Sequence, residues 1–469
     1  MALSRERMIE RMLASDPTYN GRFLTGVLTT GIYCLPSCHA RKPKPENVQF
    51  FTSSEDARAA GLRPCKICKP DEFEQGIDTD LERLESLASC ARREPGRFET
   101  VDALADEACV SVSTLHQQFR DHFHVSPGTF LIRCRIDAAR KRLLESGEDV
   151  SQVGLWAGFE SSSGFYESFR KLTGITPAAY RSLPGKESFA VSLPEGYSRD
   201  ELLKALGRDP QSVSERLEGD VYRVAYSMGR RPQLLTMKIA ERSVECSLQG
   251  DETVIAHHTA LRILNLRQDP SSFERAALES GFERLISGRE GMRIPQTPTL
   301  FEGLVWVIVG QQVNFRFAAA LRARVTEMVG VKIGDMVCMP EAAAISELEP
   351  SDLLKVQFSR QKADYLLSAA RLIASGNLDL ENLAFGSATT AARTLTAVRG
   401  LGVWSVNYLM MRALGFADCV PLGDTGIRSG VQKLFGLDHA PKPEECDALL
   451  KPFTPNRSLA CYHLWRGLS

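Results

Sequence analysis

Two close pairs of cysteines near the N-terminus constrain the fold of this chain more than any other feature of its sequence. Cys34 and Cys38 form the first pair, and Cys65 and Cys68 form the second. Two such pairs can surround one tetrahedral Zn²⁺ with four thiolates, which ties the two segments together. Buried cysteines without a metal fit this paired spacing less well. The sequence therefore predicts one bound Zn²⁺ with four cysteine ligands.

Basic residues lie close to these cysteines in the sequence. They are Arg41, Lys42, Lys44, Arg63, Lys66 and Lys69. A purely structural zinc site would not need this charge, although a solvated surface could carry it. A zinc ion with four thiolates is formally dianionic, so its sulfurs stay nucleophilic unless hydrogen-bond donors neutralise them. Transfer of an alkyl group from an electrophile to one of these sulfurs is therefore chemically feasible.

The segments around the cysteines resemble the N-terminal domain of the Ada family of adaptive-response regulators. The matching stretches are TTGIYCLPSCHAR, ENVQFF and AAGLRPCKICKPD. The resemblance implies that Cys34 accepts a methyl group from a DNA methylphosphotriester, and that the loss of negative charge at the metal then raises the affinity for DNA. The other metal ligands would be Cys38, Cys65 and Cys68. The family's phosphate-contacting positions correspond to Thr30, Arg41 and Arg63.

Residues 79–185 contain two predicted helix–turn–helix units. The second helices of these units are expected at about 113–123 and 161–172, and a long helix from Ser126 to Ser146 joins the units. One such helix pair is often only a packing unit, but two of them with the stretch GFESSSGFYESFRKLTGITPAAYR resemble the AraC/XylS-type regulators. The exposed side chains that could contact bases or phosphates are His116, Gln117, Arg120, Ser162, Tyr166 and Arg170. Among these, Arg120 and Arg170 are our candidates for DNA-binding residues.

Residues 186–290 follow a cluster of helix-breaking residues and read as a small α/β segment. The adjacent residues His257 and His258 point to different faces of a predicted helix, so they suit a shared metal site poorly and are interpreted as structural. No catalytic constellation is visible here. The expected strands and helix are Phe189–Leu193, Asp220–Met228, Leu234–Ile239, Val244–Leu248 and Thr253–Asn265.

The stretch from residue 395 to residue 424 predicts a helical hairpin with a carboxylate beside it. Gly400 and Gly402 separate two apolar helices, so the backbone can turn tightly and approach a ligand closely. Amides at such a helix N-terminus form a small nest that suits phosphate. A hairpin whose glycines only make the turn explains the same two residues. The residues that follow, namely Trp404, Tyr408 and Asp424, favour a DNA clamp.

Residues 295–469 resemble the AlkA-type branch of the helix–hairpin–helix DNA glycosylases. The matching pieces are Phe301-Glu302, Gly310-Gln311-Gln312-Val313, the hairpin, Asp424 and His463-Leu464-Trp465. Family members that cleave the strand carry a lysine where this chain has Trp404, which implies base removal without strand cleavage. The usual hairpin proline is Arg399 here, so the turn can differ in detail. A C-terminal pattern for an iron–sulfur cluster is absent from the sequence.

This resemblance implies a role for each residue of the site. Asp424 would stabilise the positive sugar of an oxocarbenium-like transition state, although a residue in this place can also simply cap the next helix. Gln312 would fill the gap that the extruded base leaves. Three aromatic residues would bind a cationic purine such as 3-methyladenine, rather than only fill the core. They are Trp404, Tyr408 and Trp465. The DNA backbone would be contacted by Arg399, Gly400 and Gly402.

Composition limits the possible partners and location. The net charge is −1, so DNA binding has to come from local basic patches. The chain has 12 cysteines and no apolar leader, which leads us to expect the reducing cytoplasm, and no stretch approaches the ~20 apolar residues of a membrane span. The Pro-Cys-His-Arg motif of O6-alkylguanine transferases is absent, so we do not expect that activity.

We therefore expect a multidomain, mainly α-helical protein with α+β parts. It would be a DNA-3-methyladenine glycosylase II fused to a methylation-dependent transcription activator. As a monomer it would bind double-stranded DNA at damaged sites and at a promoter operator, and it would contact RNA polymerase. The alternative is a transcription regulator whose glycosylase-like part only binds DNA. The expected domains are a four-cysteine zinc-binding methyl-acceptor domain at 1–78, an AraC-type double helix–turn–helix DNA-binding domain at 79–185, an AlkA-type N-terminal α/β lobe at 186–290, and a helix–hairpin–helix glycosylase domain at 291–469.

Overall fold

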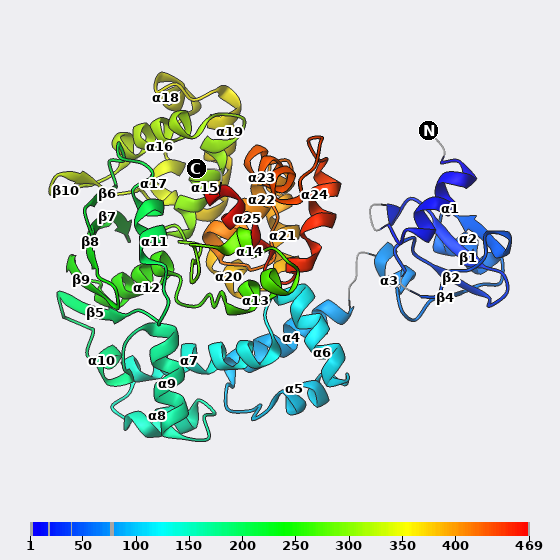
Figure 1. The fold of residues 1–469 in the computed structure, drawn as a ribbon, viewed down its shortest axis with the longest axis horizontal. Coiled ribbons are helices and arrows are strands. Elements are labelled where there is room, and N and C mark those ends of the chain that lie inside the picture. The colour runs from blue at the N-terminus through cyan, green and yellow to red at the C-terminus, as the bar shows by residue number, and fades with distance from the viewer. Residues whose placement is uncertain (1–2, 17–18, 39, 76–78, 468–469) are drawn as a thin grey trace. The chain divides into compact units, whose positions relative to one another are not determined.

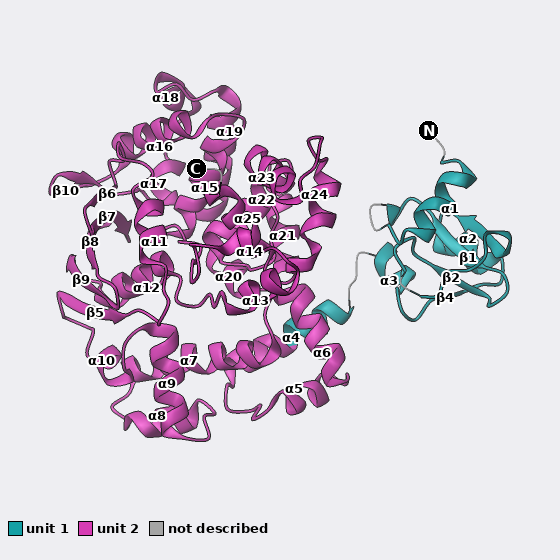
Figure 2. Ribbon diagram, viewed as in Figure 1, with its two compact units in different colours: residues 1–86 teal, residues 87–469 magenta. Residues whose placement is uncertain are grey.

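The computed structural model describes residues 3–16, 19–38, 40–75 and 79–467. These residues form two compact units, Met1–Ser86 and Leu87–Ser469, which Figure 2 shows in different colours. Each unit has its own hydrophobic core. None of the helices in the described part of the chain is both long and apolar enough to cross a membrane.

Unit 1 is built on a four-stranded sheet with the strand order β3-β1-β2-β4 (Figure 1). Strand β1 pairs antiparallel with β2 and β3, whereas β2 pairs in parallel with β4. The hydrophobic core under this sheet is small. A bound metal ion would therefore add stability, because the burial of apolar side chains alone stabilises a domain of this size only weakly. The elements are α1 (Arg5–Leu13), β1 (Leu24–Val27), β2 (Ile32–Cys34), η2 (Pro45–Asn47), β3 (Val48–Phe51), α2 (Ser54–Ala59), β4 (Arg63–Pro64) and α3 (Pro70–Glu74).

The helix–turn–helix segment of unit 2 contains both second helices that the sequence predicts. Helix α6 begins at Val112 after its N-cap Ser111, and helix α9 begins at Ser162 after its N-cap Ser161. In both caps the serine hydroxyl accepts a hydrogen bond from a backbone N–H of the first turn, which fixes where the helix starts. Helix α4 (Thr79–Arg93) precedes these units and belongs to unit 1 up to Ser86. The helices that follow are α5 (Val101–Glu107), α6 (Val112–Phe123), α7 (Pro127–Glu145), α8 (Val150–Trp156), α9 (Ser162–Thr173) and α10 (Pro177–Arg181).

A five-stranded antiparallel sheet follows, with the strand order β5-β9-β8-β7-β6. Strands β5, β7, β8 and β9 and helix α12 lie where the sequence predicts them. Further short strands were expected here, but the bounds of strand β6 and helix α11 were not predicted. Strand β6 is an edge strand made mostly of charged residues, and it lacks an apolar alternation. The elements are β5 (Ser188–Ser192), α11 (Arg199–Leu206), β6 (Glu215–Glu218), β7 (Val221–Met228), β8 (Arg231–Ile239), β9 (Ser243–Gln249) and α12 (Thr253–Leu264).

The rest of unit 2 is a helical bundle around one large hydrophobic core. The predicted helix after the hairpin is α22, which continues as the π-helical turn η3. The elements are α13 (Ser271–Glu279), α14 (Glu283–Ile286), α15 (Leu300–Gly310), α16 (Phe315–Val329), β10 (Lys332–Ile333), β11 (Met336–Val337), α17 (Ala342–Ser346), α18 (Pro350–Lys355), α19 (Arg360–Ala374), α20 (Leu380–Phe385), α21 (Ala388–Thr396), α22 (Val403–Leu409), η3 (Met410–Leu414), α23 (Thr425–Phe435), α24 (Pro443–Leu450), η4 (Lys451–Phe453) and α25 (Arg457–Arg466).

A buried ion-pair network joins the sheet to this bundle. The Arg322 guanidinium, on α16, is 1% exposed and pairs with the carboxylates of Glu302 and Glu215. It also donates to the hydroxyls of Ser212 and Ser214 at 3.0 and 2.9 Å. Burial raises the pKa of Glu302, whereas the charge of the Arg322 guanidinium opposes this shift. Because breaking a buried pair leaves an uncompensated charge, this network holds the sheet against α15 and α16.

The helix–turn–helix segment packs on the sheet's helix α12 through the buried imidazole of His257 and the exposed residue His258. His257 Nε2 lies 2.9 Å from the backbone oxygen of Thr173, and His258 Nε2 lies 3.1 Å from the Tyr180 hydroxyl. Burial lowers the pKa of His257 to about 3. Both histidines form hydrogen bonds between α12 and the helix–turn–helix segment, in agreement with their structural interpretation from the sequence.

The neutral state of His257 gives unit 2 an acid-sensitive stability. The pKa is about 3 in the folded chain, against ~6.5 in an unfolded chain. The contribution of neutral His257 to the free energy of unfolding is therefore complete above about pH 6.5 and is lost progressively as the pH falls toward 3. Between about pH 7.5 and about pH 5 the loss amounts to ~2 kcal/mol.

Replacing His257 with glutamine, whose amide can still donate to Thr173, should remove this sensitivity. Urea unfolding is measured at about pH 7.5 and at about pH 5. Between these pH values the free energy of unfolding should fall by about 2 kcal/mol more in the parent than in His257→Gln. An equal loss in both proteins would contradict the assignment.

Candidate metal centre and active site

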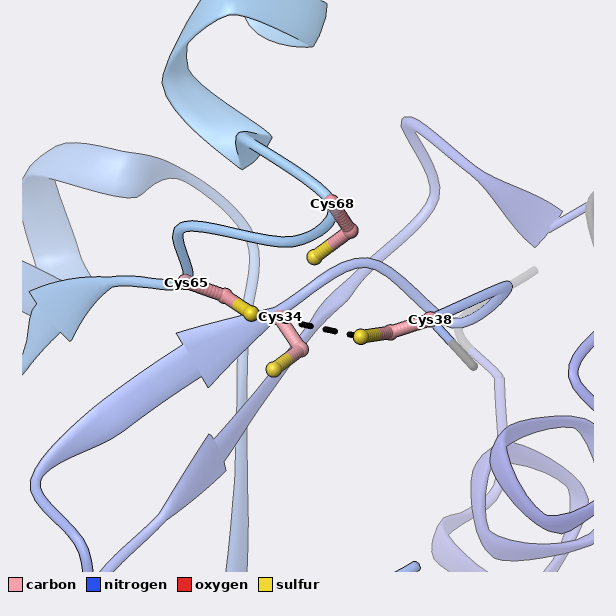
Figure 3. A group of neighbouring side chains, drawn as sticks. All are labelled: Cys34, Cys38, Cys65 and Cys68. Atoms are coloured by element: carbon pink, nitrogen blue, oxygen red, sulfur yellow. Dashed lines mark hydrogen bonds between the residues drawn. The ribbon is translucent and has the colours of Figure 1, made fainter. Parts of the chain in front are cut away.

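The fold brings the two cysteine pairs of unit 1 together (Figure 3). Cys34 is the last residue of β2, and Cys65 directly follows β4, so the parallel pairing of these strands places the two residues close to each other. Cys38 lies in the loop after β2, and Cys68 precedes α3. The four sulfurs all lie within 4.8 Å of one another.

This arrangement fits a tetrahedral Zn²⁺. Four sulfurs at ~2.3 Å from one zinc ion would be separated by about 3.8 Å, and the Cys38 and Cys65 sulfurs lie 4.0 Å apart. Two sulfurs also accept backbone hydrogen bonds, from Leu35 N–H to Cys68 at 3.3 Å and from Ile67 N–H to Cys65 at 3.4 Å. Such donors stabilise thiolates and orient them toward a metal.

Exposure divides the four ligands into two groups. Cys38 and Cys65 are buried, whereas Cys34 and Cys68 are partly exposed. The pKa of Cys38 is lowered because Cys34 and Cys68 donate hydrogen bonds to its sulfur, and the hydrogen bond to Cys38 raises the pKa of Cys34. Four thiols packed this closely need a cation before all of them can ionise. The sulfur of Cys34 is therefore one of two ligands that an incoming electrophile can reach.

The three predicted phosphate-contacting residues lie on the surface of the same unit. Thr30 is in the turn between β1 and β2, and Arg63 on β4 is paired in register with Ile32 of β2. Arg41 follows the first cysteine pair. All three side chains are exposed, and neither arginine forms a salt bridge with another residue in the described ranges. Their guanidinium groups are thus available to an anionic ligand.

In the helix–turn–helix segment, Arg120 on α6 and Arg170 on α9 are both exposed. Arg170 donates to the hydroxyl of Ser192 at 3.4 Å, whereas the amide of Gln117 donates to the Asp121 carboxylate at 2.8 and 2.9 Å. Other exposed candidates on these helices are Ser162 and Tyr166, and His116 is partly buried. Each second helix thus presents polar side chains on its exposed face.

The carboxylate of Asp424 is the centre of the second site. Asp424 is the N-cap of α23, and its Oδ1 accepts hydrogen bonds from the backbone N–H groups of Gly426 and Ile427 at 2.9 and 3.0 Å. Oδ1 also accepts from the Trp465 indole at 2.9 Å, and Oδ2 accepts from the Trp404 indole at 3.2 Å. Four N–H donors and a helix N-terminus thus stabilise a negative charge at this point. The capping role and a charged site coexist in one residue.

Aromatic rings adjoin this carboxylate. Trp404 and Tyr408 stack with their centroids 5.3 Å apart, and Tyr408 lies 5.7 Å from Trp465. All three rings are partly exposed. The structure therefore brings the three predicted pocket residues together around Asp424, where their π-faces can bind a cation.

The hairpin lies next to Gln312, the residue predicted to fill the gap in the duplex and called the wedge below. Gln311 Nε2 donates to the backbone oxygen of Gly400 at 2.7 Å and to the Ser405 hydroxyl at 3.0 Å. Gly400 has φ +95°, a conformation that favours glycine, and Gly402 is the exposed N-cap of α22. Arg399 and Gln312 are exposed. The sequence offered Gln311 only as part of a family motif and did not single out Lys362, whose ammonium donates to the Gln311 backbone oxygen at 2.7 Å.

Three family models match the chain in succession. The metal binding domain of Ada matches residues 7–71, a helix-turn-helix domain matches residues 104–182, and the HhH-GPD superfamily of base excision DNA repair proteins matches residues 305–455. Together with the four-cysteine cluster, the first match identifies a site for one Zn²⁺ with cysteine ligands.

Known proteins are similar over the same segments. The probable bifunctional transcriptional activator/DNA repair enzyme AlkA of Mycobacterium tuberculosis is 26% identical over 493 residues, which cover 99% of this chain and 96% of the relative. The bifunctional transcriptional activator/DNA repair enzyme AdaA of Bacillus subtilis is 30% identical over 178 residues, which cover 38% of this chain and 83% of the relative. A solved 3-methyladenine DNA glycosylase from Archaeoglobus fulgidus has a TM-score of 0.53 at 21% identity, covering 59% of this chain and 97% of that structure, and so shares the fold.

The metal site can be tested by counting zinc ions per chain. Native mass spectrometry should find one Zn²⁺ in the parent and none in Cys65→Ser, which lacks a buried ligand. Cys109→Ser, which changes an exposed cysteine outside the cluster, should keep the ion. Retention of zinc by Cys65→Ser at the parental level would refute the four-cysteine site.

Proposed function

This chain belongs to the Ada/AlkA family of bifunctional transcriptional activators and DNA repair enzymes, and we propose that it excises alkylated bases from DNA and activates transcription when DNA is methylated. The four-donor cage around Asp424 beside three aromatic rings is the observation that carries the catalytic part. We propose functional domains at residues 1–78, 79–185, 186–290 and 291–469, used respectively for methyl acceptance, operator binding, support of the glycosylase and base excision.

Excision breaks the bond between the base and C1′ of its sugar. The base leaves with the electron pair of that bond, and the sugar becomes positively charged until water attacks C1′. The Asp424 carboxylate stabilises this charge electrostatically. Its Oδ1 already accepts three hydrogen bonds, whereas Oδ2 accepts one, so Oδ2 is the oxygen with capacity to face the sugar and orient the water.

The aromatic rings select the substrate. A 3-methyladenine base is cationic and therefore both leaves readily and binds to electron-rich π-faces. Trp404, Tyr408 and Trp465 form that pocket once the nucleotide has left the stack, and Gln312 fills the gap in the duplex. The hairpin amides of Gly400 and Gly402, with Arg399, hold the backbone phosphate.

Strand cleavage requires an amine nucleophile at the hairpin, and Trp404 occupies that position. The ammonium of Lys362 donates to three backbone oxygens, so its hydrogens are engaged in the fold. We therefore propose a monofunctional glycosylase of the DNA-3-methyladenine glycosylase II type.

In unit 1, the sulfur of Cys34 attacks the methyl carbon of a methylphosphotriester. A sulfur–carbon bond forms, the carbon–oxygen bond breaks, and the phosphodiester leaves as an anion. When bound, Zn²⁺ holds the thiolates deprotonated and in place. The transfer neutralises one negative charge at the cluster, so the repulsion of phosphate falls and DNA in contact with Thr30, Arg41 and Arg63 is bound more tightly.

The paired helix–turn–helix units supply the regulatory half of this proposal. Arg120 and Arg170 lie on the exposed faces of α6 and α9, where they can contact operator DNA. A monomer bound there would recruit RNA polymerase. A regulator whose glycosylase-like part only binds DNA is the second candidate, because the hairpin alone would suffice for binding.

Asp424→Asn separates these two candidates. The amide can still cap α23 but carries no charge, so release of free 3-methyladenine from methylated duplex should fall at least ~100-fold. DNA affinity, measured by fluorescence anisotropy, should change little. Release at the parental rate would refute the catalytic assignment, and a parent that binds DNA but releases no base would support the regulator.

Methyl acceptance can be located by peptide mass spectrometry. After incubation with methylated DNA, the peptide with Cys34 should gain ~14 Da, the mass of one CH₂. Unmethylated DNA should give no adduct. An adduct on Cys68, the other partly exposed ligand, would contradict the assignment of Cys34.

A further inference from the structure

The exposed residue Gln312 has an unusual backbone conformation directly after α15. Its φ is +55°, in the left-handed region that residues other than glycine rarely adopt. Gln311 precedes it as the C-cap of α15. Neighbouring residues must hold Gln312 in this backbone conformation, because an isolated chain would adopt a more favourable one.

The side chain of Lys362 supplies one such support. Its ammonium donates to the backbone oxygens of Ile308, Val309 and Gln311 at 3.1, 2.7 and 2.7 Å. Two of these belong to the last turn of α15, whose carbonyls have no partner within the helix, and the positive charge lies at the negative end of the helix dipole. The third belongs to the peptide that joins Gln311 to Gln312. The ammonium thus fixes the peptide plane from which the wedge projects.

The side chain of Gln311 connects the wedge to the hairpin. Its amide donates to the backbone oxygen of Gly400 and to the hydroxyl of Ser405, which is on the helix that follows the hairpin. One residue therefore contacts both sides of the hairpin turn while its own carbonyl is held by Lys362. The two DNA-contacting segments are connected by side chains that make no predicted contact with DNA.

Helix α19 also contacts the hairpin directly. A Cβ at Gly400 would lie 2.3 Å from the ring of Tyr365, so this ring packs against the turn. Tyr365 is one turn after Lys362 on α19, and its hydroxyl accepts a hydrogen bond from Gln361 at 2.7 Å. The first turns of α19 therefore support the wedge through Lys362 and the hairpin through Tyr365.

We propose that Lys362 and Gln311 are positioning residues that fix Gln312 relative to the hairpin, so that the wedge enters the duplex where the hairpin holds the backbone. The inference rests on the proposed glycosylase function. It assigns these two residues to base extrusion and not to the chemical step, because neither contacts Asp424 or the aromatic pocket among the described hydrogen bonds.

Single-turnover excision from two duplexes tests this role. In one duplex a single 7-methylguanine faces cytosine, and in the other it faces an abasic site, where extrusion breaks no base pair. Lys362→Met and Gln311→Leu should slow excision at least ~10-fold on the paired duplex but less than about 3-fold on the unpaired one. Lys355→Met, an exposed lysine on α18, should match the parent on both.

An equal slowdown on both duplexes, or no slowdown on either, would overturn the proposal. Melting temperatures check that each variant is folded, and Gln311→Leu carries the test if Lys362→Met does not fold, since Gln311 is only partly buried.

A second readout is independent of the chemistry. In the Asp424→Asn background, fluorescence of a 2-aminopurine placed beside the 7-methylguanine should rise on binding and report extrusion. Adding Lys362→Met should remove most of that rise, and an unchanged rise would overturn the proposal. A parent that extrudes the base but releases none would refute the glycosylase function while leaving the positioning role supported.

Discussion

Four N–H groups converge on the carboxylate of Asp424, and the geometry of the glycosylase site depends on this convergence. Two come from the backbone at the start of α23, and two come from indoles on α22 and α25. Gly426 makes the arrangement possible, because a Cβ there would lie 2.9 Å from the Trp465 ring. One negative charge therefore orders three helices and two rings of the pocket. In the proposed reaction, the same hydrogen bonds that stabilise the fold would also preorganise the charge that stabilises the sugar.

The wedge and the hairpin are likewise held in place by a small number of side chains. Gln312 and Gly400 are separated in the sequence by several helices, yet Gln311 joins them by one hydrogen bond. Helix α19 supports both from one end. If Gln312 and the hairpin have the proposed roles, they must act at the same nucleotide during base extrusion, and a rigid connection between them would then matter for the reaction.

The sequence was informative where chemistry depends on spacing along the chain. The four cysteines could be assigned to one metal because a tetrahedral thiolate site restricts their spacing. Asp424 could be placed after the hairpin, and α6 and α9 could be located from the spacing of the two helix–turn–helix units. What the sequence could not reveal is the direction of side chains packed from distant segments. Nothing in it shows that the Trp404 and Trp465 indoles donate to Asp424, since those contacts depend on how α22 and α25 pack.

The contacts of the Lys362 and Arg322 side chains could not be predicted from the sequence either. Both are ordinary basic residues within amphipathic helices, where a solvated charge is the usual expectation. The structure instead places Lys362 at the end of α15 and buries Arg322 against Glu302 and Glu215. Glu302, which the sequence offered only as part of a family motif, has a structural role between the sheet and the bundle. Strand β6 was missed for a related reason, because an edge strand needs no apolar alternation.

In the proposed reaction, the caged carboxylate of Asp424 stabilises positive charge on the sugar. The most direct test of this role is the affinity for duplex DNA with an abasic analogue whose sugar ring carries a protonated nitrogen at the C1′ position, compared with an uncharged tetrahydrofuran analogue. The parent should bind the cationic analogue at least ~10-fold more tightly, and Asp424→Asn should bind the two alike. Equal binding of both analogues by the parent would contradict the claim.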